Sequence, residues 1–207
     1  MAEIDLGLRE RKKRRTRRAL AEAALRLFTE RGYDRTTVAD IAAAAEVSTR
    51  TFFSYFRSKD EVLFADTDER LALLRHALAR ADPGAPTIDV LRAVVDQVLG
   101  STVGILGPHR TTRARLTLEH PELRARGLDR ILTAQRELAG WLTRRPVRPL
   151  DGVTAAAVGG AVVGALVGAT LCSIERGDPP DRLRRELRGV LLRIEAALPA
   201  LERDGPG

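Results

Sequence analysis

Apolar residues recur every three or four positions along most of the chain, and this spacing places them on one face of an α-helix. Near the N-terminus the spacing joins Leu20, Ala24 and Phe28, and Gly32 follows where a helix commonly ends. Strand signals, which would be alternating apolar and polar residues between turn residues, are missing throughout the sequence. The pattern therefore predicts an all-α protein.

Two short helices joined by a tight turn are predicted over residues 38–56. Thr37 and Asp40 form a variant of the capping box, so the first helix can begin near Val38. Ser48 is a favourable N-cap for the second helix, because its hydroxyl can accept a hydrogen bond from an amide of the first turn. A helix-turn-helix of this kind places its second helix in the major groove of DNA, while the first helix braces against the backbone.

Further helices are predicted after Lys59, with short breaks between them. The clearest break is residues 82–86, where proline and glycine interrupt the helical pattern. The predicted helices span about residues 59–80, 90–100 (or 90–104), 108–119, 121–145, 151–174 and 180–198.

Residues 152–174 carry no charge, so a membrane-spanning helix is an alternative for this segment. Much of the segment is alanine and glycine, however, which contribute little to insertion. Its large apolar residues fall mostly on one side, and Gly160, Gly164 and Gly168 form a side of small residues. This arrangement favours a buried helix with a closely packed neighbour, and we expect no membrane partner.

Basic residues gather just upstream of the helix-turn-helix. Against Glu10 they give this segment a charge equal to the net charge of +7 of the whole chain. Such a run is often only a solvated face or a disordered tail. Beside a helix-turn-helix, it favours binding to DNA phosphates. The basic residues are Arg9, Arg11, Lys12, Lys13, Arg14, Arg15, Arg17 and Arg18.

Composition places the chain among soluble globular proteins, because 44% of its 207 residues are hydrophobic and 30% are charged. The single cysteine, Cys172, excludes an intramolecular disulfide and leaves no cysteine-based metal site. The N-terminus is charged and lacks the apolar core of a signal peptide, which predicts a cytoplasmic protein.

An enzymatic function is not expected. His76, His109 and His120 are the only histidines, and they fall on separate predicted helices without metal-ligand spacing. No glycine-rich phosphate loop follows a strand, and no Ser-His-Asp arrangement can be assembled. We therefore expect neither a cofactor nor a metal.

The segment from residue 14 to about residue 64 resembles the TetR family of transcriptional regulators. The family pattern is an alanine-rich helix, a turn, Val-Ser, a threonine followed by aromatic residues, and Ser-Lys; here it reads IAAAAEVSTRTFFSYFRSK over residues 41–59. Glu46 stands where glycine is common, so the turn must accept a residue with a Cβ at some strain. Phe53 stands where a phosphate-binding tyrosine is frequent, so that hydroxyl contact is absent.

The resemblance implies a ligand-responsive homodimer, most simply a repressor, that reads a near-palindromic DNA operator. Arg50 is the best candidate for base readout, because its guanidinium can bind guanine O6 and N7 together. Thr49 would contact a thymine methyl or a phosphate, and Ser48 a phosphate. By their position in the family motif, Thr37, Tyr55 and Lys59 should contact phosphates.

The resemblance also implies a ligand pocket among the middle helices, and dimerisation through the last two helices near residues 152–176 and 180–200. The candidate pocket residues are mostly apolar, and a few of them carry polar groups. For each of them, packing in the hydrophobic core is the alternative. Six arginines form a basic cluster that would suit an anionic effector such as an acyl-CoA, or would simply be a solvated face. The pocket candidates are His76, Leu78, Val94, Val98, Leu116, Leu138 and Trp141; the arginines are Arg110, Arg113, Arg115, Arg124, Arg126 and Arg130.

These observations predict three parts. Residues 1–13 form a basic flexible arm, residues 14–58 a three-helix DNA-binding domain with the helix-turn-helix, and residues 59–207 a larger helical domain for ligand binding and dimerisation. The sequence identifies neither the effector nor the operator, and it leaves open a role as repressor or activator.

Overall fold

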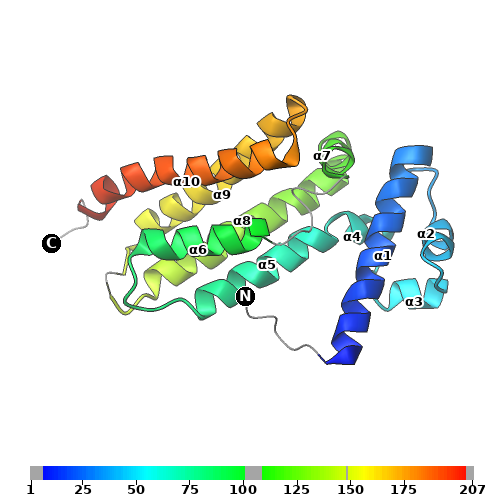
Figure 1. Ribbon diagram of the computed structural model, residues 1–207, viewed down its shortest axis with the longest axis horizontal. Helices are drawn as coiled ribbons and strands as arrows, with labels where there is room; N and C mark the ends of the chain where they lie inside the picture. The colour runs from blue at the N-terminus through cyan, green and yellow to red at the C-terminus, as the bar shows by residue number, and fades with distance from the viewer. Residues whose placement is uncertain (1–6, 101–108, 148, 204–207) are drawn as a thin grey trace.

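The computed structural model describes residues 7–100, 109–147 and 149–203, and these ranges contain ten α-helices and no β-strand. The all-α fold with an N-terminal helix-turn-helix is therefore confirmed. Figure 1 shows α1 standing across one end of the molecule, with α2 and α3 on its outer side and the longer helices extending away from it. The helices are α1 (Leu8–Arg31), α2 (Val38–Ala44), α3 (Thr49–Phe53), α4 (Lys59–Leu63), α5 (Ala65–Ala79), α6 (Thr87–Gly100), α7 (Arg110–Glu119), α8 (Pro121–Thr143), α9 (Gly152–Glu175) and α10 (Pro180–Arg203).

Side-chain caps start both helices of the helix-turn-helix. The amide of Asp40 donates to Thr37 Oγ1 over 3.2 Å, and the amide of Thr37 donates to Asp40 Oδ2 over 2.9 Å, which completes the capping box. The amide of Thr51 donates to Ser48 Oγ over 3.0 Å at the start of α3. Phe52 then anchors α3, since it is fully buried in a cluster with residues of α1 and α2.

The turn between α2 and α3 contains the strain expected from the sequence. Glu46 has φ of 55°, a left-handed conformation that costs a residue with a Cβ about 1–2 kcal/mol. Backbone hydrogen bonds hold it there, because the amide of Glu46 donates to Ala43 O over 3.1 Å and that of Val47 to Ala42 O over 3.0 Å.

Two expected boundaries are changed by the structure. Residues 8–13 are not a flexible arm but the first turns of α1, because this basic stretch contains arginine and lysine, which favour helices, and no glycine or proline. The predicted helix over residues 59–80 is interrupted at Phe64, which ends α4 and precedes α5. Because Val62 and Leu63 are buried with α1, the expected domain boundary after residue 58 falls inside the N-terminal packed unit.

A second hydrophobic cluster joins α5, α6, α8, α9 and α10. Figure 1 shows these helices running side by side, away from the helix-turn-helix. Residues of all five helices meet in it, among them Leu78, Val94, Leu138, Val158 and Leu187.

Helix α9 is buried on one side only. Ala155, Val158 and Val162 are buried against neighbouring helices, whereas a Cβ added to Gly160, Gly164 or Gly168 would meet nothing within 4 Å. By length and composition α9 could cross a membrane, with a mean hydropathy of 2.0 over its most apolar stretch. One such helix is a weak indication, because core helices of soluble proteins have the same properties.

Candidate DNA-binding helix and ligand cavity

Helix α3 carries exposed polar side chains at its start, whereas Phe52 is buried. Thr49 and Arg50 are both exposed. Within the described part of the chain, the Arg50 guanidinium forms no hydrogen bond or ion pair with another residue. An arginine that no other group of the protein holds can direct its planar fork at the edge of a guanine.

The other candidate contacts near the helix-turn-helix have partners within the protein. The hydroxyl of Thr37 donates to Asp40 Oδ2 over 2.6 Å, and these hydrogen bonds keep the pKa of Asp40 below its ordinary value. Ser48 is exposed but serves as the N-cap of α3. Tyr55 is half-buried and packs against the first hydrophobic cluster. Phosphate binding by Thr37 therefore requires its hydroxyl to leave Asp40.

Lys59 also has partners within the protein. Its Nζ lies 2.8 Å from the carbonyl oxygen of Tyr33 and 3.2 Å from that of Thr36, with a third contact of 3.5 Å to Asp34 O. It also lies 4.3 Å from the centre of the Tyr33 ring. Since an ammonium has three donors, these carbonyls account for all of them. In the absence of DNA, Lys59 thus holds the connection between α1 and α2, and its contact with a phosphate stays a prediction.

The basic residues upstream form an exposed helical surface rather than an arm. Lys12, Lys13, Arg14 and Arg15 are exposed on the first turns of α1. Arg17 is the exception, because it stacks over Phe56 at 4.6 Å and pairs with Asp68 at 3.6 Å. The charges are therefore carried on a rigid helix that leads directly into the DNA-binding unit.

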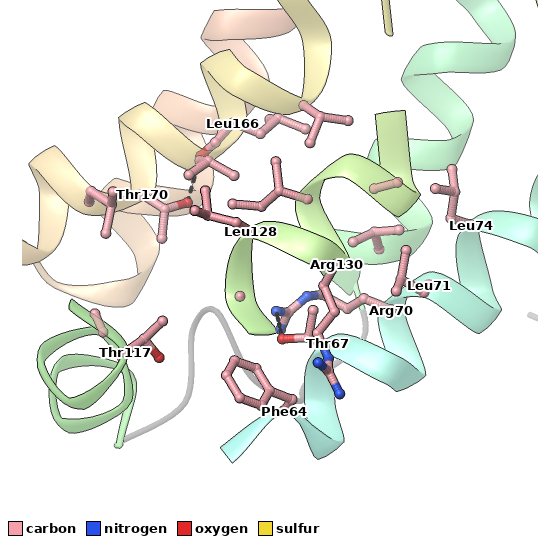
Figure 2. A pocket seen from close by; sticks show the side chains of 18 of the residues that line it. Phe64, Thr67, Arg70, Leu71, Leu74, Thr117, Leu128, Arg130, Leu166 and Thr170 are labelled. Atoms are coloured by element: carbon pink, nitrogen blue, oxygen red, sulfur yellow. Dashed lines mark hydrogen bonds between the residues drawn. The ribbon is translucent and has the colours of Figure 1, made fainter. Parts of the chain in front are cut away.

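A cavity of about 490 Å³ lies among α5, α6, α7, α8 and α9. Its volume falls in the range that holds drug-sized ligands. Figure 2 shows side chains from several of these helices pointing into it, with Leu128 and Leu166 above Phe64 and Thr67. Most of the wall is aliphatic, including Leu71, Leu74, Val94, Val95, Val98, Leu118, Ile131, Leu138, Val163, Val167, Leu171 and Ile174.

Three of the predicted pocket residues, Val94, Val98 and Leu138, line this cavity. The placement of the others is corrected. His76 is exposed near the end of α5, Leu116 is buried in the first hydrophobic cluster and Leu78 in the second. Trp141 lies beside Arg145, whose guanidinium is 5.0 Å from the ring centre. Apolar spacing alone could not distinguish these positions from the cavity wall.

The sequence reasoning missed the contribution of α9 to the cavity, because it assigned this helix to the dimer interface alone. Val163, Leu166, Val167, Thr170 and Ile174 all line the cavity. They recur at helical spacing between the buried side of α9 and the open glycines, which is a signal that could have revealed a second apolar face.

One end of the cavity is cationic. Arg113 pairs with the buried Asp66 at 2.5 Å, and burial lowers its pKa although Asp66 opposes that shift. Arg130 pairs with Asp68 at 2.8 Å and lies 4.3 Å from the centre of the Phe64 ring. Of the six arginines grouped by sequence, Arg110, Arg113, Arg124 and Arg130 line the cavity, whereas Arg115 is exposed and Arg126 pairs with Asp60.

Arg70 lies at the same end of the cavity and was not among the predicted residues. Its Nη2 donates to Thr67 Oγ1 over 2.9 Å, and its Nη1 is buried without a hydrogen-bond partner in the described structure. Burial, followed by repulsion from Arg113, lowers the pKa of Arg70 to about 10. The guanidinium therefore remains protonated at neutral pH.

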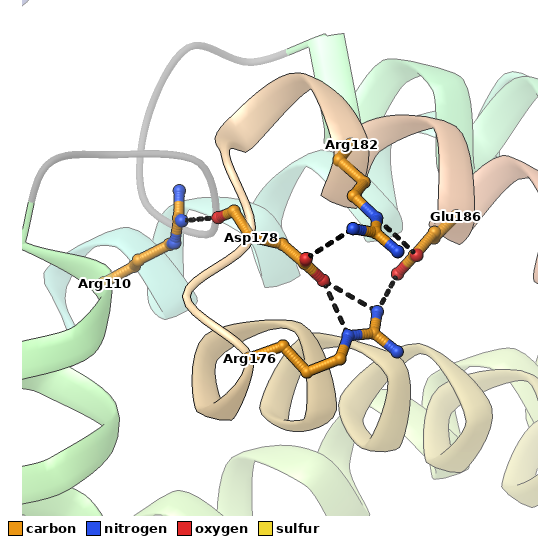
Figure 3. A network of polar contacts seen from close by, with 5 residues as sticks. All are labelled: Arg110, Arg176, Asp178, Arg182 and Glu186. Carbon is orange, nitrogen blue, oxygen red and sulfur yellow. Dashed lines mark hydrogen bonds and ion pairs between the residues drawn. The ribbon is translucent and has the colours of Figure 1, made fainter.

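An ionic network ties the cavity wall to the connection between α9 and α10. Arg110, at the start of α7, donates to the carbonyl oxygen of Asp178. The buried Asp178 carboxylate accepts from Arg176 over 2.9 Å and pairs with Arg182 at 3.1 Å, as Figure 3 shows. The hydrogen bond from Arg176 is the main reason that the pKa of Asp178 is lowered. Arg176 also reaches Glu186 at 2.7 Å, so the network joins α7, α9 and α10.

The end of α1 is tied to the connection between α7 and α8. The Tyr33 ring lies 5.0 Å from the His120 ring, and the Tyr33 hydroxyl donates to Asp60. Burial and that hydrogen bond raise the pKa of Tyr33. Thr29 and Thr112 hydroxyls lie 3.0 Å apart. Helices that form the cavity thus contact the helix that carries the DNA-binding unit.

Residues 20–65 match the family described as bacterial regulatory proteins, tetR family, and residues 85–199 match the MftR C-terminal domain. The chain is similar to the HTH-type transcriptional regulator TcmR of Streptomyces glaucescens, with 39% identity over 70% of this chain and 66% of TcmR, just under two thirds of that relative. It is also similar to MftR of Mycobacterium tuberculosis, named as a regulator of mycofactocin biosynthesis, with 30% identity over 65% of this chain and 68% of MftR.

Solved structures show the same fold. A TetR-family regulator from Mesorhizobium loti superposes with a TM-score of 0.60 at 17% identity, over 88% of this chain and 96% of that one. FadR of Thermus thermophilus, a repressor solved in complex with lauroyl-CoA, superposes with a TM-score of 0.54 at 26% identity, over 85% of this chain and 93% of FadR. These relatives are regulators of transcription and not enzymes.

Proposed function

Because the chain belongs to the TetR family of transcriptional regulators, we propose that it is a homodimeric repressor that leaves its operator when a small molecule fills the cavity. The observation that carries this proposal is the position of the cavity. Its helices contact α1 through the Thr29–Thr112 and Tyr33–His120 contacts, and α1 carries the helix-turn-helix. A ligand that changes the packing of α7 can therefore change the position of α3.

DNA binding is assigned to α3 and the start of α1. Arg50 reads a base, Thr49 contacts a thymine methyl or a phosphate, and Ser48, Thr37 and Tyr55 bind phosphates. Support comes from the exposure of Arg50 and from the basic first turns of α1, a helix whose later residues pack against α2 and α3. Two copies of α3 in a two-fold dimer would read the halves of a near-palindromic operator.

The dimer interface is assigned to α9 and α10. The glycine side of α9 is open in the single chain, and Val153 on α9 is 82% exposed. Leu192 on α10 is 58% exposed. A two-fold partner would cover such self-complementary apolar surface. In this assignment α9 lies in a protein interface and not in a membrane, and the protein acts in the cytoplasm, where it meets the chromosome.

The effector is assigned to the cavity, with Val94, Val98 and Leu138 in its wall. Support comes from FadR of Thermus thermophilus, which has the same fold and was solved with lauroyl-CoA. A ligand can release DNA only if it binds better to the arrangement of the two helix-turn-helix units that fits DNA poorly.

The test is selection of bound duplexes from a random pool, followed by fluorescence anisotropy with the selected duplex and sedimentation velocity of the free protein. A dimer that selects a near-palindromic sequence and binds it at least about a thousandfold tighter than random duplex would support the proposal. A monomer, or equal affinity for selected and random DNA, would contradict it.

A further inference from the structure

We propose that the cavity binds an apolar carboxylic acid, whose carboxylate pairs with Arg70 and whose hydrocarbon body packs against the aliphatic walls. This inference deepens the proposed effector site and rests on it. It concerns the chemical class of the ligand, which neither the helix-turn-helix nor the comparisons determine.

The first argument is that Arg70 does not hold the fold together. Its printed hydrogen bond goes to Thr67, three residues earlier on the same helix. An arginine that joins two helices would donate across to a neighbour, as Arg130 of α8 does to Asp68 of α5. Figure 2 shows the Arg70 side chain extending toward Thr67 within the lining of the cavity. The charged Arg70 side chain is thus held in an apolar site by its own helix, and in the described ranges no hydrogen bond joins it to another helix.

The second argument is the local charge balance. Three arginines at this end of the cavity, Arg70, Arg113 and Arg130, face two carboxylates. Asp66 is paired with Arg113 and Asp68 with Arg130. Glu69 is exposed and forms no ion pair with Arg70 in the described ranges. Arg70 is therefore the one of these three arginines that has no ion pair in the described ranges, although the charges of Asp66, Asp68 and Glu69 act favourably on it. An anion entering the cavity would give its guanidinium a direct partner.

The third argument is the set of available donors. A guanidinium has five N–H donors, and Nη1 of Arg70 is buried without an acceptor. Thr67 Oγ1 accepts from Arg70, so its own proton remains available as a second donor. A carboxylate has two oxygens that accept such bonds and matches the planar guanidinium fork.

The rest of the cavity wall determines what the part of the ligand away from its carboxylate must be. Leu71, Leu74, Val98, Ile131 and Leu166 present only hydrocarbon to the cavity. The hydroxyl of Thr170 donates to the carbonyl oxygen of Leu166 over 2.7 Å, so it needs no hydrogen-bond acceptor from a ligand. An apolar body with a single acidic head at the Arg70 end fits this distribution, whereas a polar molecule such as a sugar would leave its hydroxyls without partners.

The experiment measures binding of decanoate and 1-decanol to the full-length, DNA-free protein by calorimetry at pH 7.5. The alcohol has the same hydrocarbon chain but no charge, and it leaves water more readily than the carboxylate does. Tighter binding of the acid therefore requires an attraction between its carboxylate and a cation of the cavity. We expect wild type to prefer decanoate by at least about tenfold, and Arg70→Met to lose this preference while binding 1-decanol equally or more tightly. Arg70→Lys, which keeps the charge without the fork, should retain part of the preference.

The matched control is Arg75→Met, which removes the same charge from the exposed face of α5, where Arg75 pairs with Glu137. It should bind both ligands as wild type does. Thermal unfolding verifies that each variant is folded, and Arg70→Gln replaces Arg70→Met if the latter does not fold. No binding of decanoate to wild type, equal affinity for the two ligands, or a preference that survives in the neutral Arg70 variant would each overturn the inference.

Operator release is measured separately. If the Arg70-dependent preference is present but decanoate does not release the selected duplex, the ligand class stands and the proposed response to an effector fails. If a neutral ligand releases DNA while wild type shows no preference for the acid, the proposed function stands and the ligand class fails.

Discussion

Helix α9 touches the backbone of α8 at Gly159, because a Cβ added to Gly159 would lie 2.9 Å from the carbonyl oxygen of Gln135. The same atom would lie 3.4 Å from the amide nitrogen of Ala139. At Gly164, by contrast, an added Cβ would meet nothing within 4 Å in the single chain. The two glycines therefore have different uses, one inside the chain and one on its surface.

Gly159→Ala should destabilise the protein by about 1–3 kcal/mol, because the new methyl must push α8 and α9 apart at a backbone contact. Urea unfolding followed by circular dichroism measures the change. Gly140→Ala in α8 is the matched control, since a methyl there would meet only the end of the Arg144 side chain, which can move, and alanine favours the helix. Equal loss of stability in both variants would contradict the close contact at Gly159.

Gly164→Leu should leave the fold of each chain intact and weaken the dimer, because a branched side chain would enter the proposed interface twice across the two-fold axis. Sedimentation velocity should show a shift toward monomer, and operator affinity should fall because the two DNA-binding units no longer act together. An equally tight dimer would place the interface elsewhere. Recovery of the wild type mainly in the membrane pellet would instead favour the membrane alternative for α9.

Arg50→Ala should lower operator affinity by about 1–3 kcal/mol, because a bidentate contact to a base is lost. Affinity for random duplex should change far less. Anisotropy titrations with both duplexes at one salt concentration measure the difference. If both affinities fall equally, Arg50 contacts a phosphate or supports the fold.

Lys12→Gln combined with Lys13→Gln should flatten the dependence of log affinity on log salt, by about 0.9 for each phosphate contact removed. Both residues are exposed on α1, so the fold should not change. Sequence preference should persist, as judged by the ratio of operator to random binding. An unchanged salt slope would show that these turns of α1 do not contact DNA.

Arg70→Met should raise the stability of the unliganded protein by about 1–3 kcal/mol at pH 8, because it removes a buried charge that forms no ion pair in the described ranges. Burial lowers the folded-state pKa of Arg70 to about 10, well below the ordinary value of an arginine, so folding penalises the charged form. That penalty is fully present below pH 10 and disappears as the pH rises from there toward the ordinary pKa of an arginine. The stability gap between variant and wild type in urea unfolding should therefore narrow above pH 10. A variant less stable than wild type at pH 8 would show that Arg70 supports the fold.

The sequence by itself determined the helix-turn-helix, because the interactions that build it are local. Thr37 caps through Asp40 and Ser48 through Thr51, each pair three residues apart, so the residue types at that spacing predict the helix starts. The strained turn at Glu46 was expected from the family resemblance, because glycine is common at that position of the family pattern. The continuous apolar periodicity likewise predicted the all-α class.

Only the tertiary structure decided the role of Lys59 and the chemistry of the cavity. Lys59 binds the carbonyl of Tyr33, 26 residues away, and nothing in the local sequence distinguishes that contact from a phosphate contact. Arg70 faces the cavity beside Arg113, whereas Arg75 on the same helix pairs with Glu137 at the surface. Which arginine faces inward depends on how α5, α7 and α8 pack together, because helical spacing gives the faces of a helix but not the neighbours that cover them.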